Sequence, residues 1–220
     1  MNEPKTQPGS ERVSPARPPS RAKVLWMVQT AILSAILIVL AFTPLGYLRY
    51  GAIEITFMTI PVIVGAIIVG PGCGAVLGAV FGITSFIQCF GISPFGAVLL
   101  GIDPVLTFLL CMVPRVLMGW LVGLIFLALS RFQGTKKFWA YAVGSVSGAL
   151  LNTVLFVGLL LLFFGSSDYI RSFGDSTLAI LGVLVGLNAA IEATVGAVVG
   201  TAVTKALGVA LANRRPRTAA

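Results

Sequence analysis

The amino-acid sequence predicts an all-α integral membrane protein, a bundle of six transmembrane helices with both termini in the cytoplasm. The chain is 57% hydrophobic and only 10% charged, whereas a soluble domain of ordinary composition is about a quarter charged. Its mean hydropathy of +1.01 indicates that lipid is its main solvent. A spanning helix needs about 20 apolar residues, and residues 24–211 have room for about six such helices with short links.

The two ends of the chain differ in composition from the part between them. Residues 1–23 are rich in Pro, Ser and Arg and lack the large apolar side chains that a folded segment must bury, so we expect a disordered cytoplasmic tail. Residues 24–211 form the membrane domain, and residues 212–220 form a second basic tail. The first apolar run, 24–42, is longer than the core of a secretory signal and lacks a clear cleavage site.

The apolar runs and the turn residues between them define the expected helices. Turns at Pro44 and Gly46 and at 70–72 separate the first three runs. Asp103 is predicted to cap the fourth helix, ahead of Pro104 at its first position. We expect an amphipathic connector at 47–54 and loops at 91–101, 131–137 and 165–175. The predicted spans are 24–42, 55–69, 73–90, 104–130, 138–164 and 176–211.

The basic residues indicate the orientation, because cytoplasmic loops carry an excess of Lys and Arg. With the N-terminus inside, only Arg49 and Arg171 fall on the outer side. This asymmetry favours an even number of spans. Nucleic-acid binding is not expected from the net charge of +8, because topology alone explains these positions. The inner residues are Lys5, Arg12, Arg17, Arg21, Lys23, Arg131, Lys136, Lys137, Lys205, Arg214, Arg215 and Arg217.

Several classes of chemistry have no residues to support them. The chain has no histidine and three cysteines without metal-ligand spacing, so no metal site and no cofactor are expected. The glycine-rich stretch 70–74 lacks the Gly-Lys-Ser/Thr ending of a phosphate-binding loop. Paired carboxylates at a common depth are also missing. The sequence therefore predicts a protein that is not itself an enzyme.

Small residues recur at four-residue intervals. Gly70, Gly74, Gly78 and Gly82 predict a groove along one face of the third helix, since small side chains let helix backbones approach closely in a membrane. An Ala31/Ala35 pair lies in the otherwise bulky first helix. This pair could face a partner subunit instead of its own bundle.

Polar groups inside the membrane are costly and usually mark function. Arg115 and Glu192 are the ionisable examples, and Asn152 and Asn188 fall at a similar depth to Arg115 on other helices. Further polar residues on the outer part of the third helix predict a cavity open to the outside. The alternative is an Arg115–Glu192 ion pair that only ties two helices together. The candidate binding residues are Thr84, Ser85, Gln88, Arg115, Asn152, Asn188 and Glu192.

With these features the chain resembles the substrate-binding S components of energy-coupling factor (ECF) vitamin transporters. The resemblance rests on the six-helix layout, Ala31 and Ala35, and the segments 60–71, 74–78 and 188–193. Within that family, the segments 57–61 and 111–115 look most like the pantothenate-type members.

The resemblance implies a function in uptake across a bacterial plasma membrane. An S component binds its vitamin in an outward-facing pocket. It docks through small residues of the first helix, matched here by Ala31 and Ala35, onto a T component that carries two ATPase subunits. Pantothenate is an anion, so Arg115 would have a carboxylate partner.

Three other functions are compatible with the sequence. One is an S component for riboflavin, folate or another small metabolite. Another is a scaffold of the cell-shape type, which shares the fold, lacks a pocket and pairs Arg115 with Glu192 alone. The third is a self-sufficient secondary transporter, in which Glu192 would carry a proton.

Overall fold

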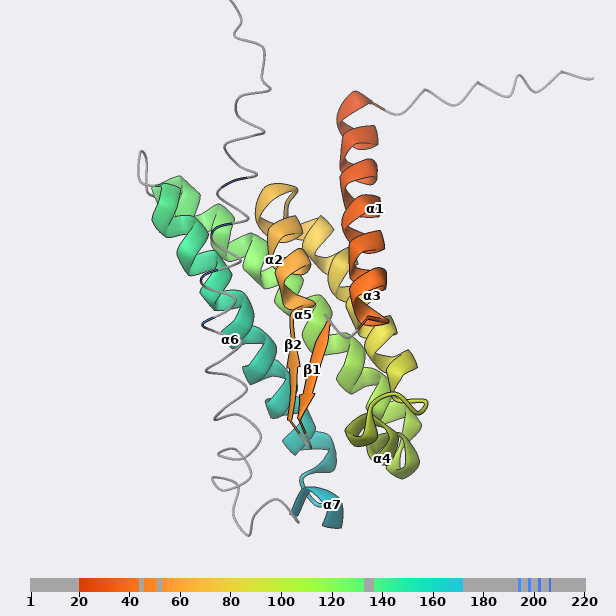
Figure 1. Ribbon diagram of the computed structural model, residues 1–220. Coiled ribbons are helices and arrows are strands. Elements are labelled where there is room, and N and C mark those ends of the chain that lie inside the picture. Colours follow the sequence, from red (N-terminus) through yellow and green to blue (C-terminus); the bar gives the residue numbers. More distant parts are fainter. Residues whose placement is uncertain are drawn as a thin grey trace, which may run out of the picture.

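The computed structural model describes residues 20–43, 46–50, 53–132 and 137–171, and the single positions 194, 198, 202 and 206. Four of its helices are long and apolar enough to cross a membrane. Figure 1 shows them packed into an elongated bundle. They are α1 (Arg21–Ala41), α3 (Pro71–Gln88), α5 (Pro104–Phe132) and α6 (Lys137–Phe164).

The long helices agree closely with the predicted spans. The first begins at Arg21 and not at Val24, three residues inside the segment predicted to be a disordered tail, and the third begins at Pro71. Asp103 caps α5 as predicted, since its Oδ1 accepts hydrogen bonds from the backbone N–H groups of Val105 (2.9 Å) and Leu106 (3.0 Å). The predicted sixth span, 176–211, lies outside the described residues, so the count of six and the cytoplasmic location of both termini stay predictions.

The predicted second span, 55–69, is helical over only part of its length. The helix there, α2 (Thr59–Ile68), has 10 residues and is about 15 Å long, half the thickness of the hydrocarbon core. Pro61 lies in its first turn, where the missing N–H breaks no helical hydrogen bond. Although short, α2 is central: it contacts α1, α3, α5 and α6.

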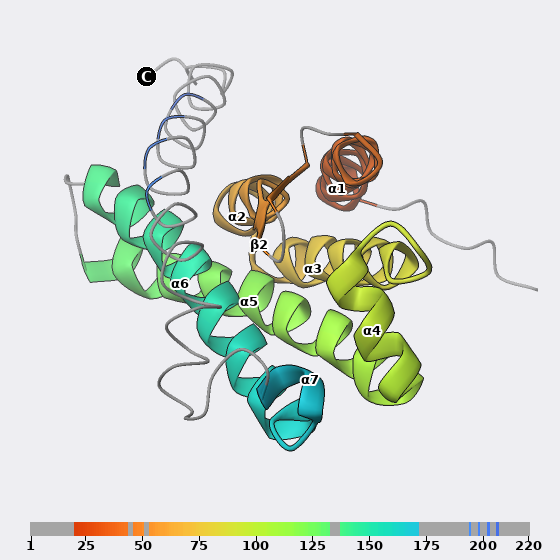
Figure 2. The ribbon, with the colours of Figure 1, turned by 60° about the horizontal axis from the view of Figure 1, so that its bottom comes forward.

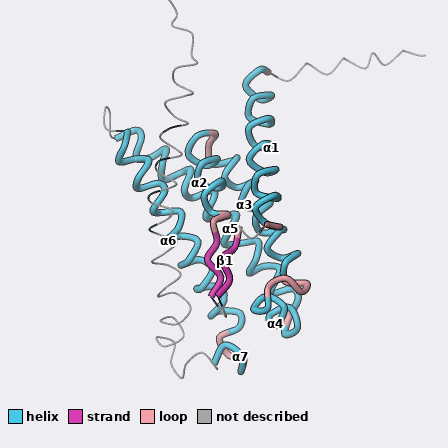
Figure 3. Tube along the Cα trace, in the orientation of Figure 1, coloured by secondary structure: helices cyan, strands magenta, loops and turns pink. Residues whose placement is uncertain are grey.

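The segment before α2 is a hairpin and not the expected amphipathic connector. Strands β1 (Tyr47–Tyr50) and β2 (Ile53–Thr56) pair antiparallel, with Tyr47 opposite Thr56 and Tyr50 opposite Ile53. β-Branched residues such as Ile53, Ile55 and Thr56 favour the extended conformation. Figure 3 shows the strands continuing from α2 toward the end of the bundle that carries α4 and α7. The all-α fold class is confirmed for the bundle, to which this hairpin adds two strands of 4 residues each.

Two predicted loops contain helices. The loop at 91–101 includes α4 (Pro94–Ile102), which is capped by Ser93: the Ser93 Oγ accepts from the Gly96 N–H at 3.1 Å. The loop at 165–175 includes the single turn α7 (Asp168–Arg171). Serine at the cap followed by proline is a helix-start signal, so α4 was identifiable from the sequence.

The core of the bundle forms around α2 and the contact between α3 and α5. Figure 2 shows α3 and α5 side by side, with α1 flanking α3 and α6 flanking α5. The buried cluster is Leu37, Ala41, Met58, Val62, Ile63, Ala66, Ile67, Cys73, Leu77, Phe81, Met118 and Val122. One polar contact joins α1 to this core, since Thr30 Oγ1 lies 3.2 Å from Cys73 Sγ.

The predicted glycine groove is confirmed, and it faces α5. A Cβ added at Gly74 would overlap the Gly119 carbonyl, one at Gly78 would overlap the Arg115 carbonyl, and one at Gly82 would lie 2.7 Å from Met112 Sδ. The contact is reciprocal, since a Cβ added at Gly119 would overlap the Gly74 carbonyl. The two backbones therefore touch along the length of α3.

This contact predicts that two glycine substitutions in α3 differ in their effect on stability. Gly78→Ala inserts a methyl group into the backbone of α5 and should lower stability by about 1–3 kcal/mol, as overpacking does. Gly72→Ala is the matched control, because its added Cβ meets nothing within 4 Å. Thermal unfolding in detergent can be followed with a thiol-reactive dye, since Cys73, Cys89 and Cys111 are all buried. Equal melting temperatures for the two variants would contradict the tight α3–α5 contact.

Candidate ligand-binding site

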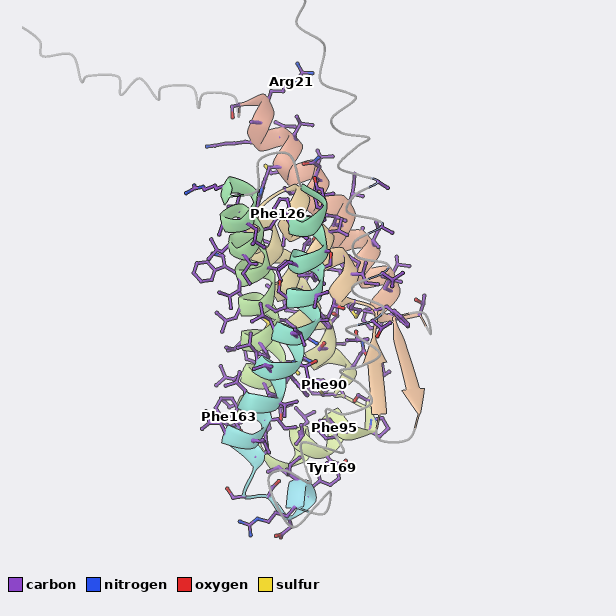
Figure 4. The ribbon with its side chains drawn as sticks, turned by 90° about the vertical axis from the view of Figure 1, so that its left-hand side faces the viewer. Arg21, Phe90, Phe95, Phe126, Phe163 and Tyr169 are labelled. Atoms are coloured by element: carbon purple, nitrogen blue, oxygen red, sulfur yellow. The ribbon has the colours of Figure 1, made fainter. Side chains whose placement is uncertain are left out.

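A cavity of about 60 Å³ opens between four helices at the end of the bundle that carries α4. Figure 4 shows Phe90, Phe95, Phe163 and Tyr169 gathered at this end, with Arg21 and Phe126 toward the opposite end. α3, α4, α5 and α6 all contribute to the walls. The lining residues are Ser85, Gln88, Cys89, Ser93, Phe95, Gly96, Leu99, Thr107, Leu110, Cys111, Arg115 and Phe156.

Arg115 supplies the cation of this cavity from the middle of α5. Its side chain runs back toward the N-terminal end of the helix, as helical side chains do. The Nη1 group donates a hydrogen bond of 2.7 Å to the Leu110 carbonyl. That acceptor is available because Pro114, inside the helix, has no N–H to offer the carbonyl four residues before it.

Two aromatic rings flank the guanidinium. The Cζ atom lies 4.4 Å from the ring centroid of Phe156 on α6 and 5.5 Å from that of Phe81 on α3. Both distances are within the range of cation–π attraction. The Nε atom is buried, and no described residue forms a hydrogen bond with it. Within the described part of the chain, no carboxylate forms an ion pair with Arg115, so its charge has only the Leu110 carbonyl and the two rings as partners.

Two other predicted binding residues reach the same cavity. Ser85 and Gln88 line it from α3. Gln88 is only 2% exposed, and its Nε2 donates to the Ala41 carbonyl at 3.0 Å. This bond ties the end of α1 to α3, so Gln88 has a structural role at the edge of the cavity.

Thr84 and Asn152 do not line the cavity. Thr84 is buried, and its hydroxyl donates to the Phe81 carbonyl at 2.9 Å. Asn152 is 6% exposed, and its Oδ1 accepts no hydrogen bond from the described part of the chain. It lies one helical turn from Phe156 on the same face of α6. The remaining predicted residues, Asn188 and Glu192, lie outside the described part of the chain.

Sequence reasoning missed several lining residues. Thr107 and Cys111 precede Arg115 at four-residue intervals, and this spacing places all three on one face of α5. The signal was therefore present in the sequence. The Cys111 Sγ lies 4.0 Å from the Cys89 Sγ of α3. Ser93, which caps α4, was missed together with that helix.

These groups suit a small organic anion. The wall offers a cation, hydroxyl groups, an amide, two thiols and two aromatic rings, and small-ligand sites are commonly apolar with a few convergent polar groups. Within the described residues, no cluster of three or more His, Cys, Asp or Glu side chains could hold a metal ion.

Ala31 and Ala35 lie at a distance from this cavity. Both are exposed on α1, four residues apart and therefore on one face of the helix. Large apolar side chains nearby, such as Ile32 and Val39, are exposed as well. This part of α1 is thus free to contact lipid or another membrane protein.

The sequence matches a known protein family. Residues 26–207 match the sequence model of the family described as "ECF transporter, substrate-specific component". No curated protein matches the chain. The family match extends from α1 through the end of α6 and beyond, so it includes every element that lines the cavity. The chain is a multi-pass membrane protein that belongs to the substrate-specific component family of ECF transporters.

Proposed function

We propose that the chain is the pantothenate-binding subunit of an ECF-type uptake transporter in a bacterial plasma membrane. The observation that carries the choice of ligand is Arg115, a cation in the cavity wall with no described carboxylate partner. Pantothenate combines a carboxylate with two hydroxyl groups and an amide. Ser85, Thr107 and Gln88 line the same cavity. Gln88 Nε2 also donates to the Ala41 carbonyl, and the Thr107 hydroxyl donates to the Asp103 carbonyl.

The small volume of the cavity sets a condition for ligand binding. A volume of about 60 Å³ holds only a few water molecules, whereas sites for small organic ligands span about 300–1,000 Å³. Binding therefore requires the walls to separate. The shortest wall element is α4, which has 9 residues and contributes Phe95, Gly96 and Leu99.

The cavity also bears on the alternative functions. A scaffold without a ligand would need no cavity at Arg115, so the cavity favours a binding role. Riboflavin, folate and other metabolites remain alternative ligands. Transport would depend on a T component and two ATPase subunits, with Ala31 and Ala35 as the docking residues on α1.

The proposed ligand leads to a prediction about binding by Arg115. The purified wild-type protein should bind radiolabelled pantothenate saturably in detergent, and Arg115→Ala should weaken binding about a hundredfold, because charge-assisted bidentate bonds are among the strongest polar contacts. Arg131→Ala is the matched control: it removes the same charge from an exposed residue of the same helix. Thermal unfolding checks that each variant is folded.

Two results would contradict this prediction. Equal affinity in Arg115→Ala and wild type would show that the guanidinium does not contact the ligand. If the wild type binds no pantothenate, riboflavin, folate and other vitamins are the next ligands to test. Failure to bind any of them would favour the scaffold.

A second prediction concerns docking. Ala31→Leu and Ala35→Leu enlarge the proposed contact face and should reduce co-purification with the T component and ATP-driven uptake, because small-residue faces let helices approach closely. Pantothenate binding by the isolated subunit should not change. Ala128→Leu, an exposed alanine on α5, is the control for enlargement as such. Undiminished assembly of both α1 variants would exclude this face as the docking site.

A further inference from the structure

We propose that Pro114 is a positioning residue, which fixes the Arg115 guanidinium so that its Nε–Nη2 edge receives a carboxylate side-on. This inference rests on the proposed function only in its choice of ligand. The positioning itself follows from the geometry of α5. It assigns the binding site a defined chemical class, a planar carboxylate, and not anions in general.

Pro114 leaves the Leu110 carbonyl of α5 without its usual backbone donor. α5 continues as a helix through Pro114, so the Leu110 carbonyl would normally accept from the N–H of residue 114. Proline has no N–H, and its ring pushes that carbonyl out of line. In a membrane such a carbonyl must find another donor. The donor is Nη1 of Arg115, at 2.7 Å.

The orientation of the guanidinium plane follows from its contacts. One terminal nitrogen is held by Leu110, and rings from two other helices flank the group at 4.4 Å and 5.5 Å. These contacts restrict a side chain that is otherwise long and flexible. A group that is ordered before binding loses less freedom when the ligand arrives.

The Nε–Nη2 edge is the side of the Arg115 guanidinium that the bond to Leu110 does not use. In a guanidinium, Nε–H and one N–H of Nη2 point in parallel along the edge opposite Nη1. Two parallel donors match the two oxygens of a carboxylate. Among the residues that the structure describes, Nε has no hydrogen-bond partner although it is buried. An unmade bond at a buried donor is unfavourable, and a side-on carboxylate would complete it.

The test restores the missing N–H. In Pro114→Ala, the N–H of residue 114 can donate to the Leu110 carbonyl and displace Nη1. Pro104→Ala is the matched control, because Pro104 opens the same helix, where an N–H has no helical acceptor. Pro114→Gly restores the same N–H and serves as a second variant. Thermal unfolding checks the fold of each.

The first readout needs no ligand. In ¹⁵N-arginine NMR spectra, with Arg115 assigned by its absence in Arg115→Ala, the wild type and Pro104→Ala should show separate Nη signals from a guanidinium with restricted rotation. Pro114→Ala and Pro114→Gly should show averaged signals. Averaged signals in the wild type, or separate signals in both Pro114 variants, would overturn the positioning role.

The second readout tests the carboxylate. Pantothenate affinity should fall about tenfold in Pro114→Ala, the effect of losing about one hydrogen bond to a charged group. Affinity for the alcohol analogue, in which a hydroxymethyl group replaces the carboxylate, should not change. Equal losses for both ligands would overturn the side-on carboxylate and indicate a general distortion. Absence of pantothenate binding in the wild type would refute the proposed ligand, and the NMR result would still decide the positioning role.

Discussion

The backbone contact between α3 and α5 is the constraint on which the rest of the structure depends. Lipid gives helices no hydrophobic reason to associate, so close packing must hold the bundle together. Gly78 lies against the Arg115 carbonyl, and Phe81, about one turn further along α3, therefore reaches the Arg115 guanidinium. The contact that stabilises the bundle also builds one side of the cavity at Arg115.

The long helices could be predicted because the bilayer sets their length. Apolar runs of about 20 residues have few alternatives to a spanning helix, and α1, α3, α5 and α6 differ from their predicted spans by a few residues. The length of the apolar run 55–69 overestimated the second helix, because this run contributes to both β2 and α2. Residues 55 and 56 belong to β2, and only Thr59–Ile68 is helical. The cap at Ser93 was overlooked because α4 is too short to span.

The sequence predicts how deep in the membrane each candidate residue lies, but not which way its side chain points. The cost of an ionisable group in a membrane identified Arg115, and Ser85 and Gln88 proved to line the same cavity. Thr84 and Asn152 lie at suitable depths but outside the lining. Position along a helix follows from counting residues, whereas the direction of a side chain depends on which neighbour each helix face meets. That information requires the packing.

Pro114 and Arg115, at adjacent positions of α5, together give hydrogen-bond partners to two polar groups in the membrane interior. A carbonyl without a donor and a cation without an acceptor are each unfavourable there, since no lipid group can replace water. The Leu110 carbonyl and Nη1 of Arg115 supply each other with a hydrogen-bond partner. The carbonyl is neutral, however, so this bond leaves the full positive charge of the guanidinium in place. Glu192, the carboxylate that the sequence suggests as a partner, lies outside the described residues. Under the proposed function, the carboxylate of the ligand would meet that charge.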